Sequence, residues 1–340
     1  MIRRRSVPLW ALALGVASVA LAGLASGPSE VGFGELVGLL GWGPDRPEAR
    51  TIILGLRLPR VGLGLAVGAG LATAGALMQA VFRNPLAEPS LIGVSSGAAL
   101  GAAMVFVFAR ELGVPPALEA TAVTLAAGLG GAVVVAVVRR VAERGGAAST
   151  ASLLLAGLAL TSLVNAALGL ALHLAEDGEL RSLTFWLLGS LGGASGAQVA
   201  VAALIMALPL VLALRLARPL DTLLLGVAEA RHLGVDVERV QRRAIGLSAL
   251  MVGASVALCG IIGFVGLLVP HLVRLGSGPG HRGLLPRAAL GGAGLVVLAD
   301  LVARTAVAPV ELPVGILTAL LGAPFFLYLL VAGAARDGAA

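Results

Sequence analysis

Residues 61–78 read VGLGLAVGAGLATAGALM and contain no charged side chain. The apolar character extends outward over residues 52–80, where Arg57 and Arg60 are the only charged residues. A helix needs about 20 mainly apolar residues to cross the hydrocarbon core of a bilayer. This stretch is therefore long enough to form one membrane-spanning helix.

Small residues recur at every fourth position of this stretch, so they share one helix face. They are Gly64, Gly68, Ala72 and Ala76, and a second pair is Gly97 and Gly101. Membrane helices use such faces to pack closely against each other. The pattern predicts close packing inside the subunit, with an interface between subunits as the alternative.

The whole chain of 340 residues is as apolar as a membrane protein requires. Hydrophobic residues make up 58% and charged residues 12%, whereas soluble domains have about 45–50% apolar and about 25% charged residues. The apolar runs are continuous, not alternating, so a membrane β-barrel is excluded. We expect an all-α integral membrane protein.

Ten candidate spans follow one another without a soluble domain between them. They are residues 7–26, 52–80, 90–109, 116–138, 150–173, 197–214, 244–263, 264–275, 286–304 and 312–332. The eighth is too short to cross alone, and Pro270 is expected to kink it. We therefore expect one transmembrane domain over residues 1–340 with about ten helices.

The distribution of arginine predicts the orientation of these spans. With the N-terminus in the cytoplasm, the inside segments, beginning with Arg3, Arg4 and Arg5, hold more than twice as many arginines as the outside segments. This agrees with the positive-inside rule. The first span could instead be a cleaved signal peptide, but a retained helix is the preferred interpretation.

The chain contains no lysine, so all its basic side chains are arginine. A P-loop requires a lysine that reaches the nucleotide phosphates. We expect that this chain is not an enzyme and that a separate subunit hydrolyses any ATP that it uses. The arginines form no stripe with interleaved aromatic residues, so nucleic-acid binding is not expected, and no cluster with metal-ligand spacing is present.

The longest inside connection, residues 215–243, reads RLARPLDTLLLGVAEARHLGVDVERVQRR. Its apolar residues recur with helical spacing, which predicts two short helices that part near Gly226 and a turn at Gly234. Such helices need a surface that receives their apolar face. The preferred partner is a cytosolic protein, and the alternative is the lipid surface.

Five motifs occur in a fixed order along the chain. They are LRLPR (residues 56–60), RNPLAEP (83–89), GFVGLLVPHLVR (263–274), HRGLLP (281–286) and ELPVGILTALLGAPFF (311–326). In this combination the sequence resembles the FecCD-type permeases, the membrane subunits of ABC importers for haem, siderophores and cobalamin. The resemblance implies a type II ABC importer permease fold, with about ten helices in each subunit of a homodimer.

The resemblance also implies roles for residues at both ends of the spans. The cytoplasmic loop at 215–243 would dock on the ATPase subunit through Gly226, Glu229, Ala230, Leu233 and Gly234, although Val227 stands where relatives often carry an acid. At the outer end, Arg57, Arg60 and Arg304 match arginines that meet glutamates of the substrate-binding protein. The alternative for these arginines is snorkelling toward the membrane interface.

Polar and small residues in the fifth and tenth spans are the candidates for the translocation path. They are Thr161, Ser162 and Asn165, and Thr318 with Gly315 and Gly322. In relatives these two helices line the path. The alternative role for the hydroxyl and amide groups is hydrogen bonding between helices.

The stretches FWLLGSLGGAS (185–195) and ARTAVAPVELPVG (303–315) are most similar to haem permeases. We therefore expect transport of haem or another bulky iron chelate by alternating access, with ferric siderophore and cobalamin as alternatives. An ion-coupled secondary transporter is the alternative from another class.

The resemblance also implies the partners and the location. They are a second copy of the chain, two cytoplasmic ATPase subunits that carry ATP and Mg²⁺, a periplasmic or surface-tethered binding protein, and lipid. No cofactor is expected on this chain. The location expected is the bacterial cytoplasmic membrane, with multiple spans.

Overall fold

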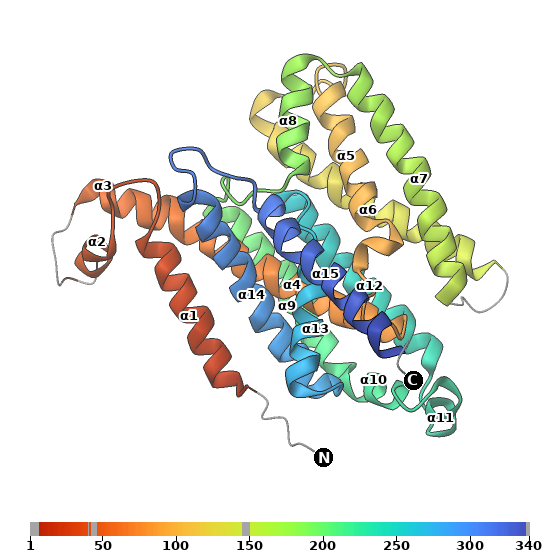
Figure 1. Cartoon of the computed structure of the whole chain (residues 1–340). Helices are drawn as coiled ribbons and strands as arrows, with labels where there is room; N and C mark the ends of the chain where they lie inside the picture. The colour runs from red at the N-terminus through yellow and green to blue at the C-terminus, as the bar shows by residue number, and fades with distance from the viewer. Residues whose placement is uncertain (1–6, 40, 42–45, 145–149, 338–340) are drawn as a thin grey trace.

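The computed structural model describes residues 7–39, 41, 46–144 and 150–337, so Arg3, Arg4 and Arg5 lie outside the described residues. The described chain is helical throughout, with turns between the helices and no strand (Figure 1). The helices are α1 (Leu9–Ala25), α2 (Phe33–Gly38), α3 (Pro47–Arg50), α4 (Leu58–Val81), α5 (Val94–Phe108), α6 (Glu119–Glu143), α7 (Thr150–Leu174), α8 (Asp177–Leu187), α9 (Gly196–Arg215), α10 (Ala217–Leu223), α11 (Val227–His232), α12 (Val237–Cys259), α13 (Val265–Ser277), α14 (His281–Thr305) and α15 (Val314–Asp337).

Every predicted span coincides with an apolar helical segment of the described chain. Six segments are long enough to cross a membrane, and they are Pro47–Val81, Pro116–Glu143, Thr150–Leu174, Gly196–Arg215, Val237–Cys259 and His281–Thr305. Four shorter apolar helices, α1, α5, α13 and α15, occupy the remaining predicted spans. The sequence prediction of an all-α membrane protein is confirmed.

Helix α4 is the central helix of the molecule. It packs against α9, α12, α13 and α14, and most of its residues are buried. Helices α5 to α8 form a second group, at the upper right of Figure 1, which α5 and α6 join to α12. A helix that is apolar on all sides is expected to lie inside a bundle, and α4 follows that rule.

Glycines allow the backbone of α4 to approach its neighbours. A Cβ atom on Gly68 would lie 2.2 Å from the carbonyl oxygen of Gly292 in α14, and one on Gly75 would lie 1.8 Å from that of Gly266 in α13. Real Cβ atoms do not approach that closely, so only glycine fits at these crossings. The predicted small-residue face therefore packs inside the subunit.

The second predicted pair of small residues has the same function. A Cβ atom on Gly101 would lie 2.1 Å from the carbonyl oxygen of Ala126, and one on Gly97 would lie 2.5 Å from that of Gly130. Both contacts join α5 to α6. Small residues thus determine the spacing of helices in both groups.

Helix α13 is short, as the sequence predicted. It has 13 residues, which corresponds to about 20 Å of helix, and it contains the buried Pro270. The predicted boundary before it is wrong, because the helix expected through residue 263 ends at Cys259. Gly260 has a φ of 72° and lies against the carbonyl oxygen of Trp186, so the chain leaves the helix there.

The non-helical segment 260–264 is bonded to elements that are distant in the sequence. The N–H group of Ser190 donates to the carbonyl oxygen of Cys259 at 2.8 Å. At its other end, the N–H group of Phe264 donates to the Glu88 carboxylate at 3.1 Å. Non-helical backbone at membrane depth requires such partners because lipid supplies none. Phe264 itself has a φ of 64°, a conformation that is uncommon for a bulky side chain.

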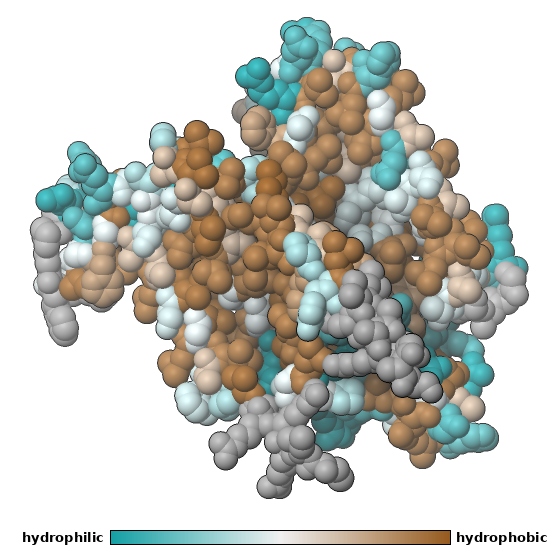
Figure 2. All heavy atoms as spheres, in the orientation of Figure 1, coloured by the Kyte–Doolittle hydropathy of each residue, from teal (hydrophilic) through white to brown (hydrophobic). Residues whose placement is uncertain are grey.

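Helix α1 packs along α14, at the left of Figure 1. The guanidinium of Arg287 donates to the carbonyl oxygen of Val7 at 3.0 Å. Helix α1 is therefore packed against the rest of the bundle through α14. Figure 2 shows hydrophobic residues over most of the visible face, and hydrophilic residues gather near α8, near α2 and α3, and near α10 and α11.

Candidate functional site

The connection between α9 and α12 contains the two predicted short helices, α10 and α11. Gly226 separates them with a φ of 125°, and Gly234 ends the second with a φ of 81°. Both values lie where glycine is favoured. A Cβ atom on Gly226 would also lie 2.1 Å from a carboxylate oxygen of Glu229. The predicted helix pair and both turns are confirmed.

One side of this loop packs against the rest of the chain, and the other side is largely exposed within the described chain. Ala230 is fully buried, whereas Leu224, Leu225 and Leu233 are 51%, 65% and 62% exposed. Glu229 and Gly234 lie on the exposed side as well. We call Leu224, Leu225 and Leu233 the loop apolar patch.

A hydrogen-bonded pair that the sequence did not suggest anchors the loop to α14. Asp221 of α10 accepts hydrogen bonds from the backbone N–H and the Nδ1 atom of His281, at 2.5 and 2.9 Å. His281 is fully buried, and it is the first residue of α14. Helix α10 is therefore bonded directly to the start of a long spanning helix.

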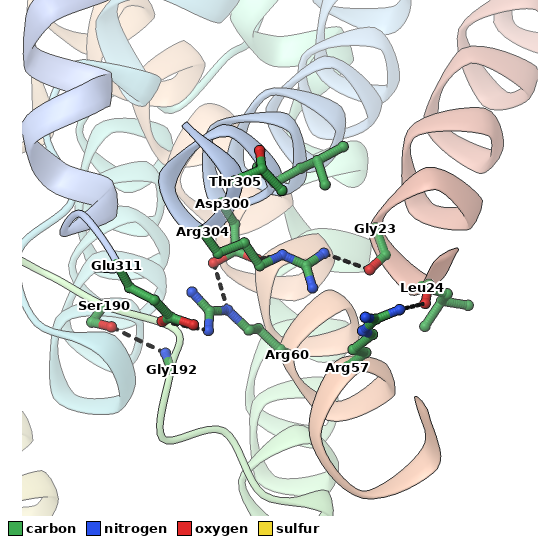
Figure 3. Close-up of polar contacts among 11 residues, drawn as sticks. Gly23, Leu24, Arg57, Arg60, Ser190, Gly192, Asp300, Arg304, Thr305 and Glu311 are labelled. Carbon is green, nitrogen blue, oxygen red and sulfur yellow. Dashed lines mark hydrogen bonds and ion pairs between the residues drawn. The ribbon is translucent and has the colours of Figure 1, made fainter. Parts of the chain in front are cut away.

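At the opposite end of the spans, the predicted arginines form a buried charge cluster (Figure 3). Arg60 Nε lies 2.7 Å from Asp300, and its Nη1 lies 2.8 Å from Glu311. Arg304 Nε lies 3.5 Å from the second oxygen of Asp300. Asp300 thus lies between two guanidinium groups, and Glu311 is the partly exposed member of the cluster.

The remaining donors of the arginines point toward helix α1. Arg304 donates to the carbonyl oxygen of Gly23, and Arg57 donates to that of Leu24 at 2.8 Å. Arg57 also donates to Ser29 Oγ at 2.9 Å. Four C-terminal carbonyls of every helix lack partners within the helix, so these arginines cap the end of α1.

The three arginines that the resemblance assigns to docking of the binding protein are buried in the single subunit. Arg57, Arg60 and Arg304 are only 4%, 8% and 2% exposed. Burial of a charge is tolerated when the charge is paired and hydrogen-bonded, and here carboxylates and carbonyl oxygens provide the partners. Asp300 lies in the predicted span at residues 286–304 and Glu311 in the ELPVG motif, but their pairing with Arg60 and Arg304 was not predicted from the sequence.

The predicted path residues of α7 lie in different environments. Thr161 and Asn165 line a cavity of about 380 Å³ together with Ser95 and Ser96 of α5 and Ile261 of the non-helical segment. Ser162 lies outside this cavity, and its Oγ donates to the carbonyl oxygen of Leu158 at 3.0 Å. Sequence reasoning missed the two serines, although they belong to a run of small residues after RNPLAEP.

The predicted path residues of α15 lie at close helix contacts. Thr318 is buried, and its Oγ1 donates to the carbonyl oxygen of Gly315 at 3.1 Å. A Cβ atom on Gly315 would lie 2.3 Å from the carbonyl oxygen of Leu188, and one on Gly322 would lie 2.3 Å from the Cβ atom of Phe264. Gly315 and Gly322 therefore let α15 approach Leu188 and the non-helical segment closely, whereas the hydrogen bond of Thr318 stays within α15.

The comparisons with known proteins agree with this arrangement. Residues 13–332 match the model of the FecCD transport family. The chain is 43% identical to the hemin transport system permease protein of Yersinia pestis, over 94% of this chain and 95% of that protein. It is 44% identical to the cobalamin import system permease protein of Halobacterium salinarum, over 84% of this chain and 74% of that protein.

A solved structure shows the same fold at full length. It is a metal-chelate type ABC transporter in an inward-facing conformation, with a TM-score of 0.83, 33% sequence identity, and coverage of 95% of this chain and 98% of that chain. The family match and the fold together make this protein a membrane permease subunit, not an ion-coupled carrier. The chain belongs to the FecCD transport family and is a permease of an ABC importer.

Proposed function

We propose that this permease moves haem into the cytoplasm by alternating access. The observation that carries the proposal is the 43% identity to a hemin permease, which extends over 94% of the chain. The cobalamin permease relative aligns over a shorter part, 84% of the chain. Cobalamin is the second candidate because this relative is equally similar, at 44% identity. Ferric siderophore stays the third candidate of the same class.

The exposed side chains of α7 support a homodimer as the transporting unit. Ser162 and Asn165 lie within this span and are exposed in the single subunit. Polar groups in a span usually face the interior of a bundle or a water-filled cavity. A second copy that covers α7 would give these residues such a setting, and Thr161, Ser162 and Asn165 would then border the path.

The loop apolar patch supports docking of an ATPase subunit on α10 and α11. The three leucines of this patch are more than half exposed within the described chain, on a loop that is rich in charged residues. An apolar anchor that fills a partner pocket is the common source of interface affinity. In this proposal two ATPase subunits carry ATP and Mg²⁺, and the loop with its Gly226, Glu229, Ala230, Leu233 and Gly234 lies in the cytoplasm.

The charge cluster supports docking of a substrate-binding protein at the opposite end. Because Arg57, Arg60 and Arg304 are buried, we infer that they position the outer ends of α1, α4 and α14 for that partner. Glu311, with 39% of its side chain exposed, connects the cluster to the surface. The transporter would then reside in the bacterial cytoplasmic membrane, with the N-terminus inside.

Uptake by proteoliposomes tests the proposed substrate. The full permease is reconstituted with its ATPase subunit and its binding protein, and haem, cobalamin and a ferric siderophore are offered separately. We expect ATP-dependent accumulation of haem and no hydrolysis by the permease alone. Accumulation of cobalamin without haem would replace the first candidate with the second.

A further inference from the structure

A cavity of about 910 Å³ lies where α9 ends and α12 begins. Its walls come from the last turn of α9 with Leu216, from Pro219 of α10, from the α11–α12 turn at residues 234–236, and from the first four turns of α12. The cavity thus lies between two spanning helices and the loop of α10 and α11. The proposed function does not use it.

The cavity carries a surplus of positive charge. Arg215, Arg239 and Arg243 line it, and Asp236 is the one acid among the lining residues. Asp236 lies 3.2 Å from Arg239 and neutralises it. Within the part of the chain that the structure describes, no carboxylate pairs with Arg215 or Arg243, so two cationic groups are available to an anion.

The apolar part of the cavity lies deeper along the same helix face. Arg239, Arg243, Leu247 and Leu250 succeed each other at intervals of three or four residues, which places them in one row on α12. Leu250 lies roughly 10 Å further into the span than Arg243, given a rise of 1.5 Å per residue. On α9, Leu212 likewise lies one turn deeper than Arg215. Leu250 is 49% exposed, so the apolar part is open toward the surrounding bilayer.

We propose that this cavity binds an anionic phospholipid, with its phosphate at Arg215 and Arg243 and one acyl chain along Gly246, Leu247 and Leu250. The order of the lining, cationic at the end of the spans and apolar within them, matches the order of chemical groups in such a lipid. Basic pockets between spanning helices are suited to anionic headgroups. The site needs only that the chain lies in a membrane, and it does not depend on which substrate is transported.

The position of the site gives the lipid a role in coupling. Residues 234–236 line the cavity, and only Leu233 separates them from the end of α11. A lipid bound there bridges the end of α9 and the start of α12 and restricts the α10–α11 loop between them. The occupant thus stiffens the element that we propose to dock on the ATPase.

Native mass spectrometry of the delipidated full chain in detergent tests the site. Phosphatidylglycerol and phosphatidylcholine with identical acyl chains are the probes, and inorganic phosphate is the competitor. We expect tight retention of phosphatidylglycerol, and roughly 30-fold weaker binding to the double variant R215Q/R243Q, since each basic group near an anionic lipid contributes about fivefold. The matched control R218Q/R242Q changes exposed arginines of α10 and α12 that do not line the cavity, and its binding should equal the wild type.

A second variant tests the acyl-chain part separately. A Cβ atom on Gly246 would meet nothing within 4 Å, so Gly246→Leu fills the cavity without disturbing the helix. We expect it to weaken phosphatidylglycerol binding while the elution volume and melting temperature of the protein stay unchanged.

Four results with lipids and inorganic phosphate would overturn the proposal. These are equal binding of phosphatidylcholine, unchanged binding to R215Q/R243Q, unchanged binding to Gly246→Leu, and displacement of the lipid by millimolar inorganic phosphate, which would indicate a simple anion site. Displacement of the lipid by the purified ATPase subunit would assign the cavity to that protein interface and would also reject a lipid occupant. None of these results bears on whether haem is the transported substrate.

Discussion

The guanidinium of Arg60 lies 2.7 Å from the carboxylate of Asp300, although 240 residues separate them in the sequence. The two side chains are 10% and 1% exposed. This ion pair joins the start of α4 to the end of α14. Glu311 pairs with the same arginine, and Arg304 lies beside the same aspartate. The end of the bundle opposite the α10–α11 loop is therefore held by electrostatic contacts, whereas the spans themselves are held by close packing.

Removal of one partner of this pair should destabilise the protein strongly. Arg60→Ala leaves Asp300 charged and partly unpaired in a buried site, which typically costs about 3–5 kcal/mol. The double variant Arg60→Ala/Asp300→Ala should lose less than the sum of the single variants because the orphaned charge is gone. Thermal unfolding of the detergent-solubilised chain measures this. The control is Arg139→Ala, which breaks an ion pair with Glu143 whose side chains are 40% and 41% exposed and should cost below about 0.5 kcal/mol.

Replacement of two core glycines by alanine should change the stability of the protein in different ways, because only one of them lies against the backbone of a neighbouring helix. Gly75→Ala places a methyl group against the carbonyl of Gly266 and forces α4 away from α13. Overpacking of this kind costs about 1–3 kcal/mol. Gly253→Ala in α12 has nothing within 4 Å, so it should be neutral or stabilising by about 0.5–1 kcal/mol. The melting temperatures of the two variants measure this difference. Equal values would show that the α4–α13 contact has room for a methyl group.

The Phe264 N–H donates a hydrogen bond to Glu88. We expect two substitutions of Glu88 to lower the stability of the protein to different extents. Glu88→Ala removes the acceptor for a backbone group at the start of α13, and hydrogen bonds to charged groups contribute about 1.5–3 kcal/mol. Glu88→Gln keeps an acceptor oxygen and should lose clearly less. Limited proteolysis and thermal unfolding of both variants measure the effect. Glu111→Ala, at an exposed position, is the control and should leave stability unchanged.

A charged substitution in the loop apolar patch should weaken binding of the ATPase subunit without unfolding the permease. Leu233→Asp alters a side chain that is 62% exposed, so the isolated permease should keep its melting temperature. Binding of the ATPase subunit should weaken by about 2 kcal/mol, or roughly 30-fold, if Leu233 is an interface anchor. Gly234→Trp, which adds bulk to the same turn, should act in the same direction.

The test of the patch is co-purification of the ATPase subunit with tagged permease. Leu112→Asp is the matched control, because Leu112 is also 62% exposed and lies in the turn between α5 and α6. Equal recovery of the ATPase subunit with Leu233→Asp and Leu112→Asp would place docking elsewhere on the loop.

Several features followed from the sequence because they depend on neighbours along the chain. The apolar runs predicted every span, since a bilayer requires about 20 apolar residues whatever surrounds them. Gly226 and Gly234 predicted the turns of the loop, since backbone conformation is a local property. The break at Gly260 was missed because its causes, Trp186 and Ser190, are distant in the sequence.

The sequence by itself determined an α-helical membrane permease, its helix order, and the residues that stand out chemically. Only the tertiary structure decided how those residues are used. Arg57, Arg60 and Arg304 look alike in sequence as free cations, yet Asp300 and Glu311 pair with Arg60, and Asp300 also lies beside Arg304. The end of α1 accepts hydrogen bonds from Arg57 and Arg304. Thr161 and Asn165 share a cavity that Ser162 does not reach. The physical reason is that charge pairing and cavity walls depend on distances between helices, which packing sets and which the order of residues along one helix does not contain.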